Sequence, residues 1–498
     1  MTPAQTTVLI ISGYLALLLA LGIFSGRFFR GTSSDYFVAS RSIGGFMLLM
    51  SVFGTTMTAF AMVGSTGEAY RIGIGTYGKL ASYSGLIHSA CFFFVGLKLW
   101  SFGKRHNYMT QIQFFRDRFE SNALGYLLFP ILVGLVIPYL LVGLLGAGAV
   151  VKGVTRGAFP ELFEVSGGSI PTWLTGLVIC GVVLTYIFIG GVRSAAWANT
   201  FQTIVFMIMG VVAFLLISRG LGGFAEASAQ ATRESMVREG RMTQLEFFSY
   251  GFIPLSVGMF PHLFQHWLTA KSAKSFHLTL VAHPIFIMLT WVPCILIGMW
   301  ATGVFPNAPS SNAVLGMMVG KFAGPIMGGL VTAGVLAAIM SSLDSQFVCL
   351  GTMFTQDVVV HKFGKDRFTD RQIMWMARGF VILIVLVTYG LSLLEPRAVF
   401  SLGVWCFSGF ASLFPLVLAA VYWKRVTKTA AIAAVLVTAS VWFGLFAASD
   451  FGKERGFLVL GAQPVAFIFL ACLLTIVVVS LFTRAPSEVT LSKFFPKK

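Results

Sequence analysis

The segment Met340–Phe347 reads MSSLDSQF and interrupts a long apolar stretch, with GGLVTAGVLAAI before it and VCLGTMF after it. It places two adjacent serines, Ser341 and Ser342, and a carboxylate, Asp344, in an otherwise apolar run. An aspartate at the centre of a membrane helix costs about 2.5–3.5 kcal/mol on insertion scales. Such a group therefore indicates a polar site inside a helix bundle.

The composition places the whole chain in a lipid bilayer. Its 498 residues are 57% hydrophobic and 11% charged, with a mean hydropathy of +0.85. Soluble domains, by contrast, carry about 25% charged residues. The apolar segments are about 20 residues long or longer, which fits spanning helices and not barrel strands. We therefore expect an all-α polytopic membrane protein.

Charge and cysteine usage exclude several function classes. The net charge is +17, but the basic residues lie in short loops between apolar segments, so they indicate orientation and not nucleic-acid binding. The six cysteines fall in apolar segments without paired spacing, which argues against a disulfide framework or a metal site. Phosphate loops and nucleophile elbows are absent from the sequence. We expect neither an enzyme nor an ATP-driven pump, and no organic cofactor.

About thirteen segments have the length and apolarity of membrane spans. They lie at 6–27, 43–69, 75–101, 123–152, 172–191, 196–219, 245–268, 275–303, 318–359, 372–393, 396–423, 428–448 and 463–483. Basic loops alternate with loops that hold roughly half as many basic residues, mixed with acidic ones, so the positive-inside rule predicts an outside N-terminus and a cytoplasmic C-terminus. We expect a multi-pass monomer of the inner or plasma membrane.

Two of these spans contain helix-breaking residues. The span at 43–69 has GTT (54–56) in its middle, and the span at 245–268 contains GFIPLSVGMFP (251–261). Glycine and proline are common in membrane helices anyway. Breaks at matching positions of two five-helix halves, however, are typical of inverted repeats with a binding site between them.

The domain boundaries follow from this placement of the breaks. We expect an extra N-terminal helix and loop at 1–42, a first repeat at 43–219, an extracellular loop at 220–244, a second repeat at 245–423, and two extra helices with a cytoplasmic tail at 424–498.

The chemistry of the serine pair suits a small hard cation. Hydroxyl oxygens, together with the carbonyls that an unwound helix exposes, are ligands appropriate to Na⁺. The alternative is that Ser341 and Ser342 hydrogen-bond between helices or to their own backbone. The neighbouring Asp344 favours the cation.

Four motifs are similar to those of the sodium/solute symporter family, which includes proline, pantothenate and sodium–glucose transporters. They are DYFVASRSIGG (35–45), GGVRSAAWANTFQ (190–202), PHLFQHWLTAKSAK (261–274) and AAIMSSLDSQFVCLGTMFTQD (337–357). The resemblance covers nearly the whole chain and implies the LeuT-like inverted-repeat fold. It also implies a Na⁺ site made by the carbonyls of Gly54, Met57 and Ala338 and the hydroxyls of Ser341 and Ser342.

One departure from the family pattern concerns a second cation. Asn199 stands where the family often has an aspartate that helps to form a second sodium site, which puts that site in doubt. Asp344 and Ser345 occupy the corresponding positions on the facing helix, so a cation or proton site at Asp344, Ser345 and Asn199 is one interpretation. The other is that Asp344 only hydrogen-bonds Asn199 or pairs with an arginine.

The solute is expected to bind between the two breaks. Thr56 replaces an acidic residue of the proline transporters, and Ile253 and Val257 replace aromatic contacts, which argues against proline. The candidate lining residues are Thr55, Thr56, Thr58, Tyr139, Ser256, Val257, Gly258, Phe260 and Trp405.

Lys79 is a further candidate for the solute site. It either extends outward to water or pairs with Glu68 at the outer mouth, or it attracts an anionic solute, which would then be a carboxylate. The function that these observations favour is Na⁺-coupled symport that imports a small organic solute. The alternatives are a solute sensor with the same fold and H⁺ coupling through Asp344.

Overall fold

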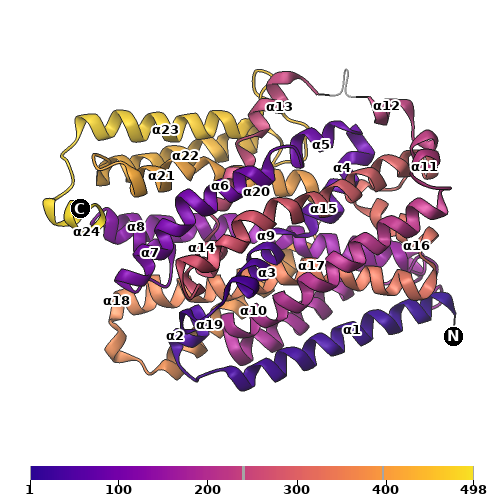
Figure 1. Ribbon diagram of the computed structural model, residues 1–498, viewed down its shortest axis with the longest axis horizontal. Helices are drawn as coiled ribbons and strands as arrows, with labels where there is room; N and C mark the ends of the chain where they lie inside the picture. Colours follow the sequence, from indigo (N-terminus) through magenta and orange to yellow (C-terminus); the bar gives the residue numbers. More distant parts are fainter. Residues whose placement is uncertain (1, 238–241, 395–397, 497–498) are drawn as a thin grey trace.

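The computed structural model describes residues 2–237, 242–394 and 398–496, and within these ranges it is helical, without a named strand. Ten helices are long and apolar enough to cross a membrane, or up to twelve if each of two bent pairs counts as one span. Most of the long helices run side by side along the molecule (Figure 1). The expected all-α polytopic architecture is confirmed.

The longest helices are continuous or nearly so. They are α1 (Pro3–Ser25), α9 (Asn122–Val154), α10 (Thr172–Gly220), α15 (Phe276–Val304), α17 (Gly324–Met353), α19 (Asp370–Ser392), α20 (Val399–Ser412) with α21 (Phe414–Tyr422), α22 (Lys428–Ala448) and α23 (Pro464–Phe482). One further span, Gly75–His106, is built from α5 (Gly75–Leu80), α6 (Ser84–Cys91), η4 (Phe92–Gly96) and α7 (Leu97–His106).

The two bent pairs coincide with the helix breaks expected from the sequence. The first joins α3 (Gly45–Thr56) to η3 (Phe60–Gly64) and α4 (Ser65–Ile72) with a bend of 55°. The second joins α13 (Gln244–Tyr250) and η6 (Ile253–Gly258) to α14 (Pro261–Thr269) with a bend of 48°. The remaining α-helices are α2 (Ser33–Val38), α8 (Gln111–Arg118), α11 (Phe224–Gln230), α12 (Arg233–Met236), α16 (Val314–Phe322), α18 (His361–Phe363) and α24 (Glu488–Phe494).

The expected count of about thirteen spans is not confirmed, and the difference lies in α10. This helix has 49 residues, which at about 1.5 Å per residue is more than twice the thickness of a hydrocarbon core of about 30 Å. Gly191 interrupts it with φ 54° and ψ −136°, so its two arms correspond to the two spans expected at 172–191 and 196–219. The start of the span expected at 396–423, and part of the loop expected at 220–244, lie outside the described residues.

Helix α17 lies at the centre of the bundle. It packs against α1, α3, α9, α10, α14 and α19, and every residue from Val331 to Met353 is buried. Helix α1 runs along one side of the molecule, and the α22–α23 pair runs along the opposite side (Figure 1). This central position explains how a chain so rich in apolar residues can hold the polar MSSLDSQF stretch: protein surrounds it.

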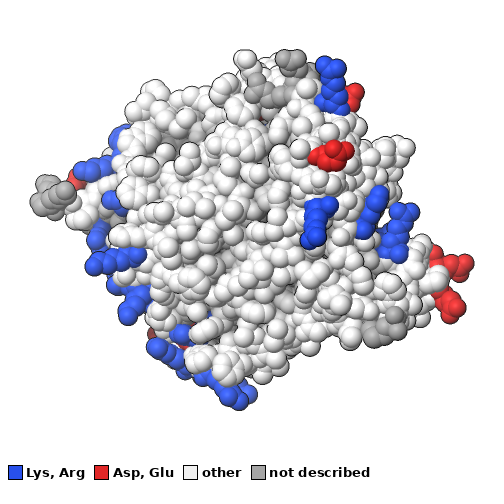
Figure 2. All heavy atoms as spheres, turned by 45° about the vertical axis from the view of Figure 1, so that its right-hand side comes forward, with Lys and Arg blue, Asp and Glu red and all other residues white. Residues whose placement is uncertain are grey.

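The start of the first broken span is joined to the end of the second by backbone hydrogen bonds at one end of the molecule. The backbone amide of Ile43 donates to the Thr269 carbonyl (3.0 Å), and the amide of Lys271 donates to the Ile43 carbonyl (2.9 Å). Basic side chains gather at this end, where Figure 1 shows α8, α18 and α24, whereas the opposite end carries both signs of charge (Figure 2). The outside N-terminus remains a prediction from this asymmetry.

A buried ion pair fixes the loop that precedes α3. The Asp35 carboxylate is fully buried and accepts hydrogen bonds from Arg193 Nε (2.9 Å) and Nη2 (2.5 Å), from the Ser40 hydroxyl and from the Arg30 amide. Burial opposes ionisation of Asp35, but these donors and the Arg193 charge outweigh it and hold its pKa below the usual value. The loop is therefore tied to α10 beside the Gly191 break.

Candidate functional site

The break in the first span has a local cause in its sequence. Helix α3 ends at Thr56, and Met57 has φ −90° and ψ 93°, outside the helical region. The Thr58 hydroxyl accepts a hydrogen bond from the Phe60 amide (3.0 Å), and the Thr56 hydroxyl donates to the Phe53 carbonyl (2.8 Å). Threonine hydroxyls compete in this way with the backbone ladder and favour helix ends. Gly54, Thr55 and Met57 are buried at this break.

The serine pair on α17 faces this break directly. The Ser341 hydroxyl lies 2.7 Å from the Gly54 carbonyl and 2.9 Å from the Ala338 carbonyl, and donates to them. The Ser342 hydroxyl accepts from the Gln346 amide (2.6 Å). Hence four of the five expected Na⁺ ligands belong to two helix segments in contact, although they are up to 288 positions apart in the chain.

The close approach of α3 depends on glycine at position 54. A Cβ atom there would lie 2.4 Å from Thr203 Oγ1 on α10 and 3.5 Å from Ser341 Oγ. Thr203 is itself held, because its hydroxyl donates to the Met50 carbonyl (2.9 Å). Three helices therefore converge around the Gly54 carbonyl.

The donor set fits Na⁺ and not a transition metal. Carbonyl and hydroxyl oxygens are hard, uncharged ligands. Across the residues described by the structure, no group of three or more His, Cys, Asp and Glu side chains could hold a metal ion. The carbonyls of Gly54 and Ala338 and the hydroxyl of Ser341 would hold the ion.

Asp344 lies one turn further along α17 in a dense hydrogen-bond network. Tyr186 OH donates to Oδ2 (2.8 Å), and the Ser345 hydroxyl lies 3.0 Å from Oδ1. In the amide orientation that satisfies both partners, Asn199 Nδ2 donates to the two carboxylate oxygens at 3.0 and 3.1 Å, and its oxygen accepts from Ser345. His266 Nε2 lies 2.9 Å from the Ser345 hydroxyl. The structure thus brings Asp344, Ser345 and Asn199 together, as the sequence suggested.

A cavity lies between the two breaks, as expected for the solute site. It encloses about 420 Å³ of empty space, open solvent included. Its lining is Thr56, Met57, Phe60, Leu80, Ser84, His88, Tyr139, Tyr250, Ile253, Pro254, Ser256, Val257, Phe260, Trp291 and Phe407. No charged side chain is in this set. Aromatic rings pack around one side, with Tyr139 centred 5.3 Å from Phe260 and 4.9 Å from Phe407.

The other expected solute residues lie outside this central cavity. Thr55 is buried in α3, and the Thr58 hydroxyl caps the restarted helix. Gly258 packs against the Phe414 ring, which would lie 2.5 Å from a Cβ at that position. Trp405 and Lys79 line a second, outer cavity.

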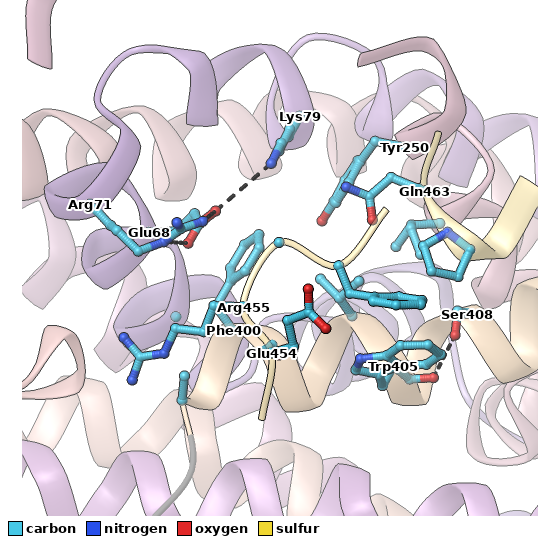
Figure 3. A pocket seen from close by; sticks show the side chains of 18 of the residues that line it. Glu68, Arg71, Lys79, Tyr250, Phe400, Trp405, Ser408, Glu454, Arg455 and Gln463 are labelled. Atoms are coloured by element: carbon cyan, nitrogen blue, oxygen red, sulfur yellow. Dashed lines mark hydrogen bonds and ion pairs between the residues drawn. The ribbon is translucent and has the colours of Figure 1, made fainter. Parts of the chain in front are cut away.

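The outer cavity encloses about 770 Å³ of empty space, open solvent included, and meets the central cavity at Tyr250 and Ile253, which line both. Figure 3 shows Lys79 and Arg71 converging on Glu68, with Tyr250 opposite. Lys79 Nζ lies 2.6 Å from Glu246 Oε1 and 3.8 Å from Glu68 Oε1, and both carboxylates are nearly buried. Lys79 therefore forms the ion pair with Glu68 that the sequence offered as one interpretation.

Sequence reasoning missed several residues of the site. Tyr186, Thr203 and Glu246 carried no signal, because each becomes relevant only through a contact with a distant helix. His266 could have been found, since a histidine within a broken membrane span is rarely without a polar partner.

Comparison with known proteins identifies the family of this chain. A family model for the sodium:solute symporter family matches residues 36–438. The sodium/proline symporter of Salmonella typhimurium is 25% identical over 92% of this chain and 90% of its own length. The sodium/pantothenate symporter of Haemophilus influenzae is 23% identical over 85% and 87%.

Among solved structures, a substrate-bound, outward-open Na⁺-coupled sialic acid symporter superposes with a TM-score of 0.76 at 17% identity, over 97% of this chain and 99% of its own. This likeness shows a common LeuT-like fold. Since the family model covers most of the sequence, the chain belongs to the sodium:solute symporter family.

Proposed function

We propose that this chain imports a small organic solute together with Na⁺ by alternating access. The observation that carries the proposal is the contact of the Ser341 hydroxyl with the carbonyls of Gly54 and Ala338 at 2.7 and 2.9 Å. The full proposed ligand set is Gly54, Met57, Ala338, Ser341 and Ser342. All five supply oxygen atoms of the kind that Na⁺ prefers.

Sodium bound there would couple two parts of the molecule. The Gly54 carbonyl belongs to the broken span, whereas Ser341 belongs to the central helix α17. An ion can shift a conformational equilibrium only by its differential affinity for the two states. Sodium held between α3 and α17 would therefore favour the arrangement in which these helices touch, and so prepare the adjoining central cavity for the solute.

The finer proposal is that the solute carries a carboxylate. Lys79 Nζ lies 6.0 Å from the ring centre of Tyr250, which lines both cavities. A carboxylate that enters from outside would exchange with Glu246 or Glu68 on Lys79. Thr56, Tyr139, Ser256, Val257 and Phe260 line the central cavity and are proposed to contact the solute there, and Trp405 is proposed to line its entry through the outer cavity. Thr55, Thr58 and Gly258 are proposed to shape the two breaks around it.

A second cation or proton site is proposed at Asp344, Ser345 and Asn199. The carboxylate already accepts from Tyr186, and Ser345 and Asn199 lie within hydrogen-bond distance of it. A metal cation would have to displace these donors, whereas a proton would need only one of the oxygens. This favours the proton over a second Na⁺.

Purified protein in liposomes tests the proposal. An inward Na⁺ gradient is applied, and the uptake of radiolabelled Na⁺ is measured in the presence of candidate solutes. Carboxylates are tested first, then neutral amino acids and sugars. We expect one solute class to accelerate Na⁺ entry, and we expect that solute to accumulate only with Na⁺ outside. Solute binding without uptake of either species would contradict transport and indicate a sensor.

A further inference from the structure

A cavity that shares no lining residue with the central and outer cavities lies at the basic end of the molecule. It encloses about 880 Å³ of empty space, open solvent included. Its lining comes from the end of α8, the start of α22 and the segment after α23: Arg118, Phe119, Glu120, Val426, Lys428, Thr429, Thr483, Arg484, Ala485, Pro486 and Ser487.

The charges around this cavity are unbalanced. Three cations, Arg118, Lys428 and Arg484, line it together with one carboxylate, Glu120, which leaves a net charge of +2. The Glu120 carboxylate accepts hydrogen bonds from the hydroxyls of Ser487 and Thr490. None of the three cations forms an ion pair with a carboxylate in the ranges that the structure describes. The cavity is therefore suited to an anion.

One of the three cations is fixed in place. Arg118 is fully buried, and its Nε and Nη2 donate to the carbonyls of Ala420 (2.9 Å) and Trp423 (3.1 Å) at the end of α21. Its Nη1 is buried and has no hydrogen-bond partner among the residues that the structure describes. Burial lowers the pKa of Arg118 to about 10, so the guanidinium is still charged at neutral pH.

The cavity also lies at a membrane boundary. Helix α22 begins at Lys428 and α23 ends at Phe482, so the lining residues mark where two spans leave the apolar core. Apolar side chains next to the lining are exposed: Leu481 by 59%, Phe482 by 86% and Val489 by 76%. A free anion would use the cations alone, whereas a phospholipid would cover the apolar side chains as well.

We propose that this cavity binds the phosphate of an anionic phospholipid, with Lys428 and Arg484 contacting the headgroup and the acyl chains lying against Leu481 and Phe482. Basic pockets beside membrane helices on the cytoplasmic side are suited to such headgroups. The predicted orientation places this end of the molecule at the cytoplasmic leaflet, where anionic lipids are concentrated.

The test titrates short-chain phosphatidylglycerol into purified protein in a neutral detergent and follows the melting temperature. Short-chain phosphatidylcholine and inorganic phosphate are the parallel ligands. The test variant is Lys428→Gln/Arg484→Gln. The matched control is Lys365→Gln/Arg367→Gln, which removes the same charge from exposed positions outside the cavity. Arg118 is left intact because it also holds the end of α21.

We expect phosphatidylglycerol, and not phosphatidylcholine, to stabilise the wild type. Each cation near an anionic lipid contributes about fivefold in affinity, so the test variant should bind about thirtyfold more weakly. The control variant should bind like the wild type. Absence of a phosphatidylglycerol effect, or equal weakening in both variants, would overturn the site. An equal shift with inorganic phosphate at the same concentration would overturn the lipid as its occupant.

Discussion

Replacing Gly54 by alanine should weaken Na⁺ binding although every proposed Na⁺ ligand, including the carbonyl of residue 54, is kept. The new Cβ would lie 2.4 Å from Thr203 Oγ1, well inside normal contact distance. The Thr203 side chain is held in this position, because its hydroxyl donates to the Met50 carbonyl of α3, the helix that also contains Gly54. The strain must therefore push α3 away from α10, and the Gly54 carbonyl moves with it relative to Ser341.

The size of the effect follows from the packing of these three helices. An extra methyl group in a well-packed core costs about 1–3 kcal/mol. If about half of this strain, about 0.5–1.5 kcal/mol, is expressed at the ion site, Na⁺ affinity falls about two- to tenfold, since about 1.4 kcal/mol corresponds to a factor of ten. Alanine also favours the helix by up to about 1 kcal/mol, but this gain is the same with and without Na⁺.

The assay is the melting temperature as a function of NaCl, with choline chloride keeping the ionic strength constant. The matched rescue is Gly54→Ala/Thr203→Ala, which removes the nearest atom and leaves the next contact, Ser341 Oγ, at an ordinary 3.5 Å. We expect the double variant to recover most of the Na⁺ affinity. An unchanged affinity in Gly54→Ala, or no recovery in the double variant, would refute the reasoning.

Three further predictions concern charged groups. Arg193→Gln leaves the buried Asp35 carboxylate without its main partner, so the free energy of unfolding should fall by about 3–5 kcal/mol. The double variant Asp35→Asn/Arg193→Gln should lose less free energy of unfolding than Arg193→Gln. The difference in this free energy between the double variant and wild type should shrink below about pH 4, because folding lowers the pKa of Asp35 and the stability that its carboxylate contributes is lost on acidification. A difference that does not change with pH would contradict this. Asp344→Asn replaces the carboxylate that accepts from the Tyr186 hydroxyl by an amide. We expect the free energy of unfolding in choline chloride to fall by about 1–3 kcal/mol, and a melting curve equal to that of wild type would contradict a stabilising role of the Asp344 hydrogen bonds. Lys79→Gln should lower uptake of carboxylates and leave the Na⁺-dependent stabilisation intact, and equal uptake would exclude Lys79 from solute binding.

The parts of the fold that could be predicted are those with a local cause. Glycine, threonine and proline act on the backbone where they stand, so the breaks at 54–56 and 251–261 could be recognised from the sequence. The serine pair could be recognised because hydroxyls beside a carboxylate are conspicuous in an apolar run. The spans expected at 172–191 and 196–219 place a boundary just after Gly191, but that a single helix, α10, covers both and is interrupted at Gly191 was not predicted.

The parts that could not be predicted depend on which distant side chains meet. Tyr186 contacts Asp344 from 158 positions away, and its own surroundings in the sequence are those of any buried tyrosine. Lys79 could be paired with Glu68 because both flank one short turn. Its closer partner, Glu246, comes from the second broken span. Such pairings depend on how distant helices pack against one another, and hydropathy and helix-breaking residues carry no information on that packing.

The most direct test of the Na⁺ site is the melting temperature of the purified protein in NaCl against equal choline chloride, for wild type, Ser342→Ala and Ser412→Ala. Ser412 is a buried serine of α20 that bonds only its own helix, so it controls for the loss of a hydroxyl. A ligand at a hundred times its dissociation constant stabilises the native state by about 2.7 kcal/mol. We predict a Na⁺-dependent rise in wild type and Ser412→Ala that is lost in Ser342→Ala. An equal rise in all three proteins would contradict the Na⁺ site at the serine pair.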